Sequence, residues 1–172
     1  MENKKHGRKI VSSHHLATER GWQLSEVEFG LIIAYNGFSR WINHCMAAAG
    51  NPNLSTLEIL VLHNIKHRNR SKRLTDVCFL LNMEDIHTIN YAIKKLVKHQ
   101  LISGKKSGKE MLYSVTDDGS ALCDKYREIR EQCLIDGLST ISNDGNELRE
   151  IASTLRKMSG IFDQASRAAS SL

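Results

Sequence analysis

Proline is nearly absent from this chain of 172 residues, which contains one, Pro52. Aromatic residues are also scarce, at 6% of the sequence. Because proline interrupts helices and aromatic residues are enriched in strands, this composition favours a mostly helical fold. The length suits one domain, or one compact module with helical extensions.

Paired cysteines and long apolar runs are missing as well. The four cysteines lie far apart and form no CxxC pair, so structural disulfides are not indicated. No apolar run approaches the roughly 18 residues that a membrane-spanning helix needs. The apolar core of a signal peptide is absent from the first residues, MENKKHGRKIVSSHH. We therefore expect a cytoplasmic protein with no membrane contact.

Signatures of catalysis and of cofactor binding are not found either. Gly104 and Gly108 lie between two predicted strands, whereas a phosphate-binding loop lies at a strand-to-helix turn. No Ser/His/Asp signature occurs. His63 and His67 have the spacing of two metal ligands on a helix, but no carboxylate or cysteine at matching spacing completes a set. The sequence predicts no enzyme activity, no cofactor and no metal site.

Positive charge, in contrast, is abundant and concentrated. The formal net charge is +5 and the pI is near 9.1. Residues 66–109 contain eleven Lys and Arg and three Asp and Glu, about +8, whereas residues 1–65 and 110–172 come to about +1 and −4. An excess confined to one segment favours an anionic partner, and nucleic acid is the usual one.

Hydrophobic periodicity predicts helices before this basic segment. Apolar residues at helical spacing favour a helix of about 24 residues that starts at Ser25 and is stopped by the Gly-Asn-Pro sequence at 50–52. Ser25 with Glu28 has the spacing of a capping box, and so has Ser55 with Glu58, where the next helix is expected to start.

Two further helices are expected after the basic segment and the residues that directly follow it. One begins at Thr116 and is interrupted at residues 142–144. The last one passes through Leu148 and Phe162 and is expected to fray after Gln164.

The most specific pattern lies between residues 73 and 119. A short helix is expected after Arg73, and Asn82 suits the tight turn that follows it, because asparagine tolerates the left-handed conformation. Asp85 is a favourable N-cap for a further helix. The apolar positions of the short helix are Val77, Cys78, Leu80 and Leu81. The second helix has an apolar face of Ile89, Ala92, Ile93, Leu96 and Val97. Its other face carries His87, Thr88, Tyr91, Lys94, Lys95 and Lys98.

A β-hairpin is predicted to follow these two helices. Residues 101–103 and 111–115 have the composition of strands, and the link 104–109 has glycines where a hairpin needs them. We expect this link to be a flexible loop that carries lysines. Helix, turn, helix and a basic hairpin, in this order, are the plan of a winged helix-turn-helix.

These segments resemble the MarR family of bacterial regulators, named for multiple antibiotic resistance. Residues 85–102 match the recognition-helix pattern of that family without a gap, and Leu101–Ile102 fall on its "Leu-Val" entry to the wing. Residues 115–119 correspond to the "Leu-Thr-x-x-Gly" sequence that starts the next helix. The residues on the buried positions of the pattern are Ile89, Ile93 and Leu96.

The resemblance implies a homodimer that acts on double-stranded DNA. The first helix and the last two would form the dimerisation layer, and a small-molecule effector or thiol oxidation would release the DNA. The fold class is therefore mainly α with a small hairpin wing. The expected division is a flexible arm at 1–24, an N-terminal dimerisation helix at 25–54, a winged helix module at 55–116 and C-terminal dimerisation helices at 117–172.

Predicted DNA contacts fall into two groups. Base contacts are expected from the first turns of the recognition helix, where Asn can pair with adenine and Thr can touch a thymine methyl group. Phosphate contacts are expected from the wing, from the connector before the short helix, and from lysines further along the recognition helix. The recognition-helix residues are His87, Thr88, Asn90, Tyr91, Lys94 and Lys95. The wing and backbone residues are Lys105, Lys106, Lys109, Arg70, Lys72 and Arg73.

Plainer interpretations exist for each feature. The helix face and the connector could be ordinary solvated surfaces, and a charged hairpin can merely protect an edge strand. Tyr35, Phe38 and Trp41 could line an effector pocket or form a dimer core. The cysteines could sense oxidants, although inert packing is the usual role of cysteine in an apolar stripe.

The sequence predicts a sequence-specific transcription regulator, and a repressor in particular, that binds a pseudo-palindromic operator as a homodimer. The alternatives are a winged helix that serves as a protein-interaction scaffold, or a DNA-binding protein without sequence preference.

Overall fold

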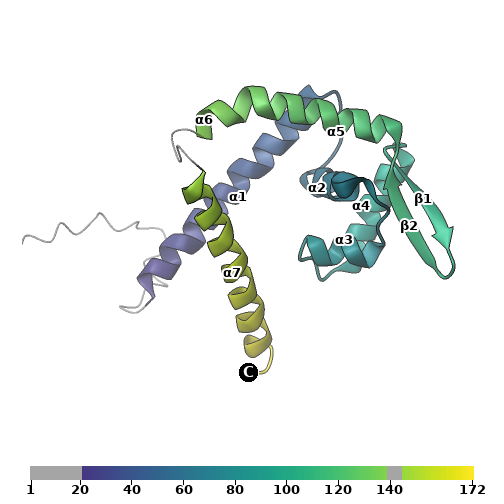
Figure 1. The fold of residues 1–172 in the computed structure, drawn as a ribbon. Coiled ribbons are helices and arrows are strands. Elements are labelled where there is room, and N and C mark those ends of the chain that lie inside the picture. The colour runs from purple at the N-terminus through teal and green to yellow at the C-terminus, as the bar shows by residue number, and fades with distance from the viewer. Residues whose placement is uncertain (1–20, 139–144) are drawn as a thin grey trace, which may run out of the picture. The chain divides into compact units, whose positions relative to one another are not determined.

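The computed structural model describes residues 21–138 and 145–172. Residues 1–20 of the predicted arm at 1–24 and the predicted helix break at 142–144 lie outside these residues, whereas residues 22–24 of that arm belong to a helix. The chain forms two compact units, one up to Tyr126 and one from Arg127 onwards. Figure 1 shows their elements.

The first unit contains a long helix, three shorter ones and a hairpin. Its elements are α1 (Trp22–Ala48), α2 (Thr56–Lys66), the 3-10 turn η2 (His67–Asn69), α3 (Leu74–Leu80), α4 (Ile86–Lys98), β1 (Ile102–Ser107), β2 (Glu110–Val115) and the first part of α5 (Asp117–Arg130). The second unit contains the end of α5, the π-helical segment η3 (Glu131–Ile135), the short α6 (Asp136–Leu138) and α7 (Asn146–Ala169). The mostly helical fold with a two-stranded hairpin is the predicted class.

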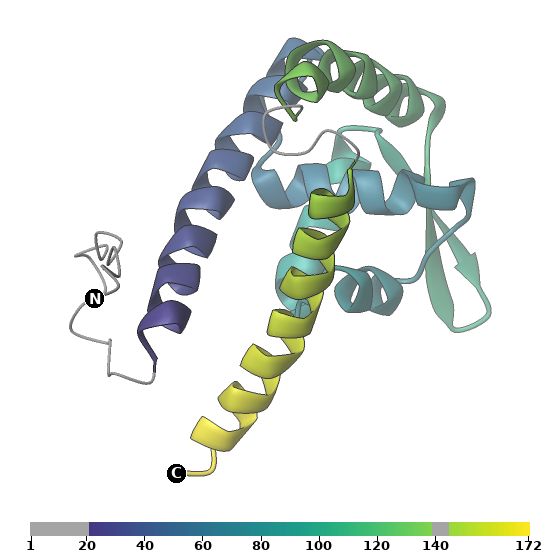
Figure 2. The same ribbon diagram turned by 60° about the vertical axis from the view of Figure 1, so that its left-hand side comes forward.

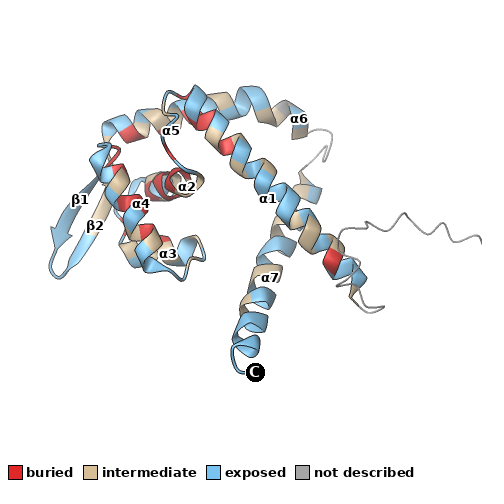
Figure 3. Ribbon diagram, turned by 180° about the vertical axis from the view of Figure 1, so that it is seen from behind, coloured by how far each residue is buried: buried red, intermediate tan, exposed pale blue. Residues whose placement is uncertain are grey.

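The core of the first unit lies between α2 and α4. Figure 3 shows buried residues gathered on these two helices and on the C-terminal end of α1, whereas most of the hairpin is exposed or intermediate. The predicted apolar face of α4 is buried at four positions, with Val97 as an exposed exception. The largest buried side chains of the two helices are Ile59, Leu62, Ile65, Ile89, Ile93 and Leu96.

Local sequence signals explain several element boundaries. Ser55 and Glu58 form the predicted capping box, in which the Ser55 amide donates to Glu58 Oε2 at 2.8 Å. Asn82 has a φ of +51°, as expected for the turn before α4. Gly119 is required at the start of α5, since an added Cβ would lie 2.0 Å from the carbonyl oxygen of Leu101. Thr116 fixes that start, because its hydroxyl accepts a hydrogen bond from the Gly119 amide.

The predicted ends of two helices are wrong. Helix α1 begins at Trp22, and Ser25 lies inside it and is buried, with its hydroxyl donating to the Gly21 carbonyl. Helix α7 continues to Ala169, beyond the predicted fraying at Gln164. Serine and alanine are acceptable inside a helix, so the composition of these residues did not mark the end.

Long apolar side chains remain exposed on α1. The N-terminal two thirds of this helix present them to solvent, whereas Ile42, Cys45 and Met46 near its other end are buried. The exposed set includes Val27, Ile32, Ile33, Tyr35 and Phe38. In the second unit, α7 separately exposes Ile151, Leu155, Ile161 and Phe162.

Candidate nucleic-acid interface

Helix α4 starts at a well-formed cap. The Asp85 carboxylate accepts a hydrogen bond from the His87 amide at 2.9 Å and another from the Thr88 hydroxyl. These hydrogen bonds, that from the Thr88 side chain first, hold the pKa of Asp85 below its usual range. The predicted N-cap is thus confirmed. Because the Thr88 hydroxyl is bound to Asp85, we expect its methyl group to be the part available for other contacts.

The exposed face of α4 brings several predicted contact residues together. His87, Tyr91, Lys94 and Lys98 are exposed and follow one another at helical spacing of three or four residues. Tyr91 is the most exposed of the named aromatic residues of the module after Phe79, at 71%. Asn90 is half-buried. This face could enter a groove with His87 and Tyr91 near the helix start and lysines further along.

Lys95 of α4 is bound to other residues of the module, whereas its neighbour Lys94 is exposed. Its ammonium is 3.0 Å from Glu58 Oε2 and 3.3 Å from the carbonyl oxygen of Asn53. Both partners belong to the start of α2 or the loop before it. Lys95 is therefore engaged inside the module, a contact that its position in the sequence did not indicate.

Most of the predicted link over residues 104–109 is strand, so the prediction of a loop over all of it is wrong. Strand β1 continues to Ser107, which pairs with Glu110, and the turn consists of Gly108 and Lys109. Gly108 has a φ of +61°, which a two-residue hairpin turn requires. The hairpin extends beyond the helices of the module in Figures 1 and 2.

The strand conformation separates the wing lysines. Lys105 pairs with Leu112 and Lys106 with Met111 across the hairpin. Because successive side chains of a strand point to opposite faces, these two lysines cannot share one face. Both are exposed, as is Lys109 at the turn. A DNA backbone beside the hairpin could therefore meet Lys109 and one of the two strand lysines.

The connector before α3 contains a lysine that points into the module. Lys72 is 5% exposed, and its ammonium donates to the carbonyl oxygens of Asn64 and, at 3.0 Å, of His67. Its backbone pairs with Tyr113 of the wing. Burial first, and then the positive charges of Arg70 and Arg68, lower the pKa of Lys72. This lysine therefore stabilises the end of α2.

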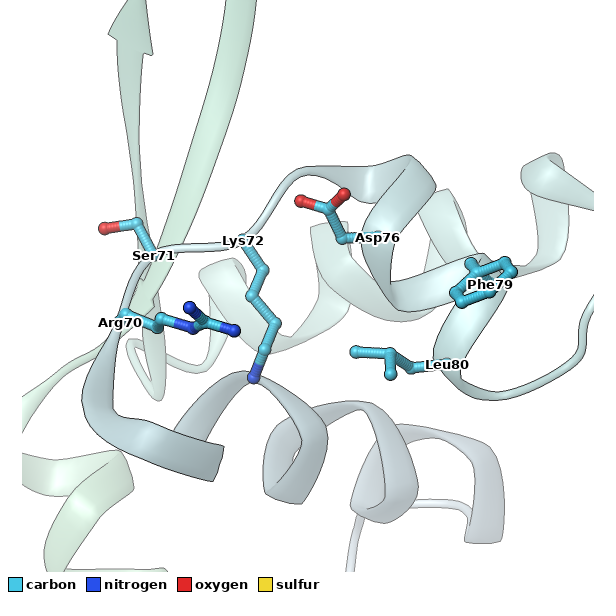
Figure 4. Close-up of a pocket in the computed structure, with 6 residues that line it drawn as sticks. All are labelled: Arg70, Ser71, Lys72, Asp76, Phe79 and Leu80. Atoms are coloured by element: carbon cyan, nitrogen blue, oxygen red, sulfur yellow. The ribbon is translucent and has the colours of Figure 1, made fainter.

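Figure 4 shows the Lys72 side chain running towards the adjacent helix, with Arg70 next to it. A hollow of about 440 Å³ lies here, bounded on the α3 side by Phe79 and Leu80. Phe79 is 85% exposed, and Leu80, one of the apolar positions of the short helix in the sequence, is also exposed. Arg70 is exposed.

Arg73 is held by two carboxylates. Its guanidinium lies 3.1 Å from Asp76 Oδ1 and 3.3 Å from Glu110 Oε1, so it joins the start of α3 to the wing. Hydrogen bonding to Arg73 lowers the pKa of Asp76. A phosphate approaching Arg73 would have to compete with these carboxylates.

Three side chains considered from the sequence as possible metal ligands or redox sensors are packed within the first unit: His63, Cys45 and Cys123. His63 packs on Tyr126 with ring centroids 4.5 Å apart, and burial lowers its pKa. Among the described residues no group of three His, Cys, Asp or Glu side chains could hold a metal ion. Burial raises the pKa of the Cys123 thiol to about 11, and Cys45 is also buried. No helix within residues 21–138 and 145–172 is long and apolar enough to cross a membrane.

Residues 54–119 match the family described as the winged helix DNA-binding domain. Among solved structures, the chain is similar to reduced AbfR bound to DNA, with a TM-score of 0.70 and 14% identity over 84% of this chain and 97% of that one. A mutant MarR from E. coli complexed with operator DNA has a TM-score of 0.66 and 14% identity, over 82% and 99% of the two chains. A third similar structure is that of BpsR of Bordetella bronchiseptica, a protein whose DNA binding is described as regulated by 6-hydroxynicotinic acid. Its TM-score is 0.59 and its identity 23%, over 78% and 93%. No match was found among curated protein sequences.

Proposed function

We propose that this chain, which has the fold of MarR-type winged helix proteins, regulates transcription by binding double-stranded DNA in a sequence-specific way as a homodimer. The observation that carries the proposal is the exposed face of α4, where His87 and Tyr91 precede Lys94 and Lys98, next to a wing tipped by Lys109. The winged helix match over residues 54–119 covers both elements. We propose a binding function without enzyme activity, exerted in the cytoplasm.

The proposed interface divides into two roles. His87, Tyr91 and Asn90, with the Thr88 methyl group, would contact base edges in the major groove. Lys94, Lys106 or Lys105, Lys109 and Arg70 would contact phosphates and supply most of the salt-dependent affinity. Lys72 and Lys95 are engaged inside the module and take neither role.

The exposed apolar surface of α1 supports the homodimer. Seven large hydrophobic side chains of this one helix are exposed, and extensive exposed apolar surface is typical of a protein–protein contact. A second copy that covers them would place two recognition helices on one duplex, so the operator would be a pseudo-palindrome. We expect half-sites about one helical turn apart. Repression would follow from steric block of a promoter.

A small-molecule effector is a further part of the proposal. The similarity to BpsR, for which regulation of DNA binding by 6-hydroxynicotinic acid is described, supports a search for one. The aromatic residues Tyr35 and Phe38 of α1 are exposed on the subunit and could serve either an effector site or the dimer contact.

The test is selection of random duplex DNA by the purified full-length protein at two salt concentrations, with the mass of the complex measured. Enrichment of a palindrome by a dimer supports the proposal. Salt-dependent binding that enriches no motif would indicate a DNA-binding protein without sequence preference. An absence of binding at both concentrations would overturn the proposal in favour of a protein-interaction scaffold.

The division of roles is tested on the enriched duplex. We expect Lys109→Ala to weaken binding to the enriched and to a scrambled duplex by the same factor, and to reduce the salt slope by about 0.9. Tyr91→Ala should instead lower the preference for the enriched duplex, by roughly 5- to 100-fold per base pair lost. Identical behaviour of the two variants would contradict the assignment.

A further inference from the structure

Helix α4 is joined to the start of α2 by an ion pair at a nearly buried position. The ammonium of Lys95 is 3.0 Å from Glu58 Oε2, and the two side chains are 32% and 5% exposed. The same oxygen of Glu58 accepts the hydrogen bond from the Ser55 amide at 2.8 Å. Glu58 thus caps α2 and holds a lysine of α4 at the same time.

The surface beside this pair is hollowed, although the core faces of the two helices are closely packed. A hollow of about 520 Å³ lies between the start of α2 and the first turns of α4. The residues that line it are Ser55, Leu57, Glu58, His87, Thr88, Tyr91 and Ala92. Ile89, Ile93 and Leu96 anchor another face of α4 in the core. On the side of His87 and Tyr91 the helix borders this open hollow, and the ion pair adds a polar contact to the packing of the core face.

The ion pair lies at the end of this hollow, one helical turn beyond Tyr91. A buried carboxylate requires a compensating cation, and breaking such a pair is costly because one charge is left without its partner. The pair therefore resists both rotation of α4 about its axis and movement away from α2. Contacts to base edges depend on hydrogen-bond geometry, so small displacements of His87 or Tyr91 would affect discrimination between bases.

We propose that Glu58 and Lys95 are positioning residues for the recognition helix, and that Lys95 acts on Glu58 and not on a DNA phosphate. The inference rests on the proposed function of α4. It assigns opposite roles to two adjacent lysines: Lys94 supplies affinity for any duplex, whereas Lys95 supplies specificity through the pose of the helix.

The experiment measures affinity for the enriched and the scrambled duplex over a series of salt concentrations, with the full-length protein. Lys95→Met retains the apolar stem and removes the charge. We expect it to lower the ratio of the two affinities roughly tenfold while the salt slope is unchanged. The matched control, Lys94→Met, should reduce the slope by about 0.9 and leave the ratio unchanged.

Two further variants separate the pair from general effects. Lys95→Arg can still reach Glu58 and should restore the ratio. Glu58→Gln can still accept the Ser55 hydrogen bond, but it releases Lys95, so the ratio should fall while the slope becomes no smaller. A Lys95→Met variant that loses slope as Lys94→Met does, with its ratio intact, would overturn the proposal. So would unchanged behaviour of both Lys95→Met and Glu58→Gln.

Thermal unfolding without DNA keeps the inference separate from the proposed function. Binding is compared at a temperature where every variant is folded, and Glu58→Gln replaces Lys95→Met if the latter does not fold. If the wild type enriches no duplex, the proposed function fails. The contact between Glu58 and Lys95 is then tested by the thermal unfolding midpoints of Lys95→Met, Glu58→Gln and the double variant. Non-additive shifts support coupling of α2 to α4 through this pair, and additive shifts contradict it.

Discussion

The lysines of the winged helix look alike in the sequence but fall into two groups in the structure. Some are exposed to solvent, and others bind residues of the module through their ammonium groups. Lys94, Lys106 and Lys109 are exposed on α4 and the wing. Lys72, in the connector, is nearly buried, and its ammonium binds carbonyl oxygens at the end of α2. The first group can neutralise phosphates, and the second stabilises the module that presents them.

This difference shows what a count of charges omits. The connector contributes to the positive excess of residues 66–109, yet its charges differ in availability. Arg70 is exposed, Arg73 is shared by Asp76 and Glu110, and Lys72 is turned inwards. The available positive charge of the proposed DNA surface is therefore concentrated on α4 and the wing more than the sequence indicates.

The largest expected effect is that of Lys72→Met on stability. The variant leaves the carbonyl oxygens of Asn64 and His67 without the ammonium donor, and we expect a loss of about 2 kcal/mol in the free energy of unfolding. Lys106→Met, on the exposed wing, should leave the urea midpoint nearly unchanged.

For DNA binding we expect the opposite ranking of the two variants, with Lys106→Met having the larger effect. Well below its unfolding midpoint, Lys72→Met should keep the wild-type salt slope, whereas Lys106→Met should lose up to about 0.9. A Lys72→Met variant that is as stable as the wild type but has a smaller slope would show that Lys72 contacts phosphate and that the comparison is wrong.

The histidines provide a second comparison of buried with exposed groups. Burial lowers the pKa of His63, whereas an unfolded histidine titrates near about 6.5. Below that pH the unfolded state binds more protons, so stability should fall as the pH decreases through 6.5 and be constant above it, with a slope of at most about 1.4 kcal/mol per pH unit.

His63→Phe keeps a ring against Tyr126 and should remove this part of the pH dependence. Urea unfolding between pH 7.5 and 5 measures the difference between the variant and the wild type. His87→Phe, on the exposed face of α4, is the matched control. An unchanged pH profile in His63→Phe would mean that the buried ring carries no linked proton.

Local signals made much of the fold predictable. The Ser55 capping box, the Asp85 cap, the left-handed Asn82 and the apolar face of α4 each depend on residues a few positions apart, and each is present in the structure. Gly119 was recognised as part of a family pattern, and its physical reason is the approach of α5 to the Leu101 carbonyl.

The features that the sequence did not predict depend on distant partners. Whether Lys95 points to solvent or to Glu58, and whether Lys72 is buried, is decided by how α2, α3 and α4 pack. The wing was expected as a hairpin with a loop over residues 104–109, because glycines border that link, but pairing across the hairpin extends the strands to Ser107 and Glu110. Helical spacing locates a face, and only packing determines which of its charges remain free.

The smallest expected effect tests the intermediate case, Arg73. Glu110→Gln removes one of the two carboxylates that hold its guanidinium at the base of the wing. At low salt we expect affinity for any duplex to rise about two- to threefold, since exposed ion pairs are weak, and the gain to disappear at high salt. Glu131→Gln is the matched control, because it removes the same charge from an exposed pair with Arg130, outside the winged helix. Equal gains in affinity for the two variants would show that only the net charge of the protein matters. A gain confined to Glu110→Gln would show that Arg73 is partly available to DNA once one of its carboxylate partners is removed.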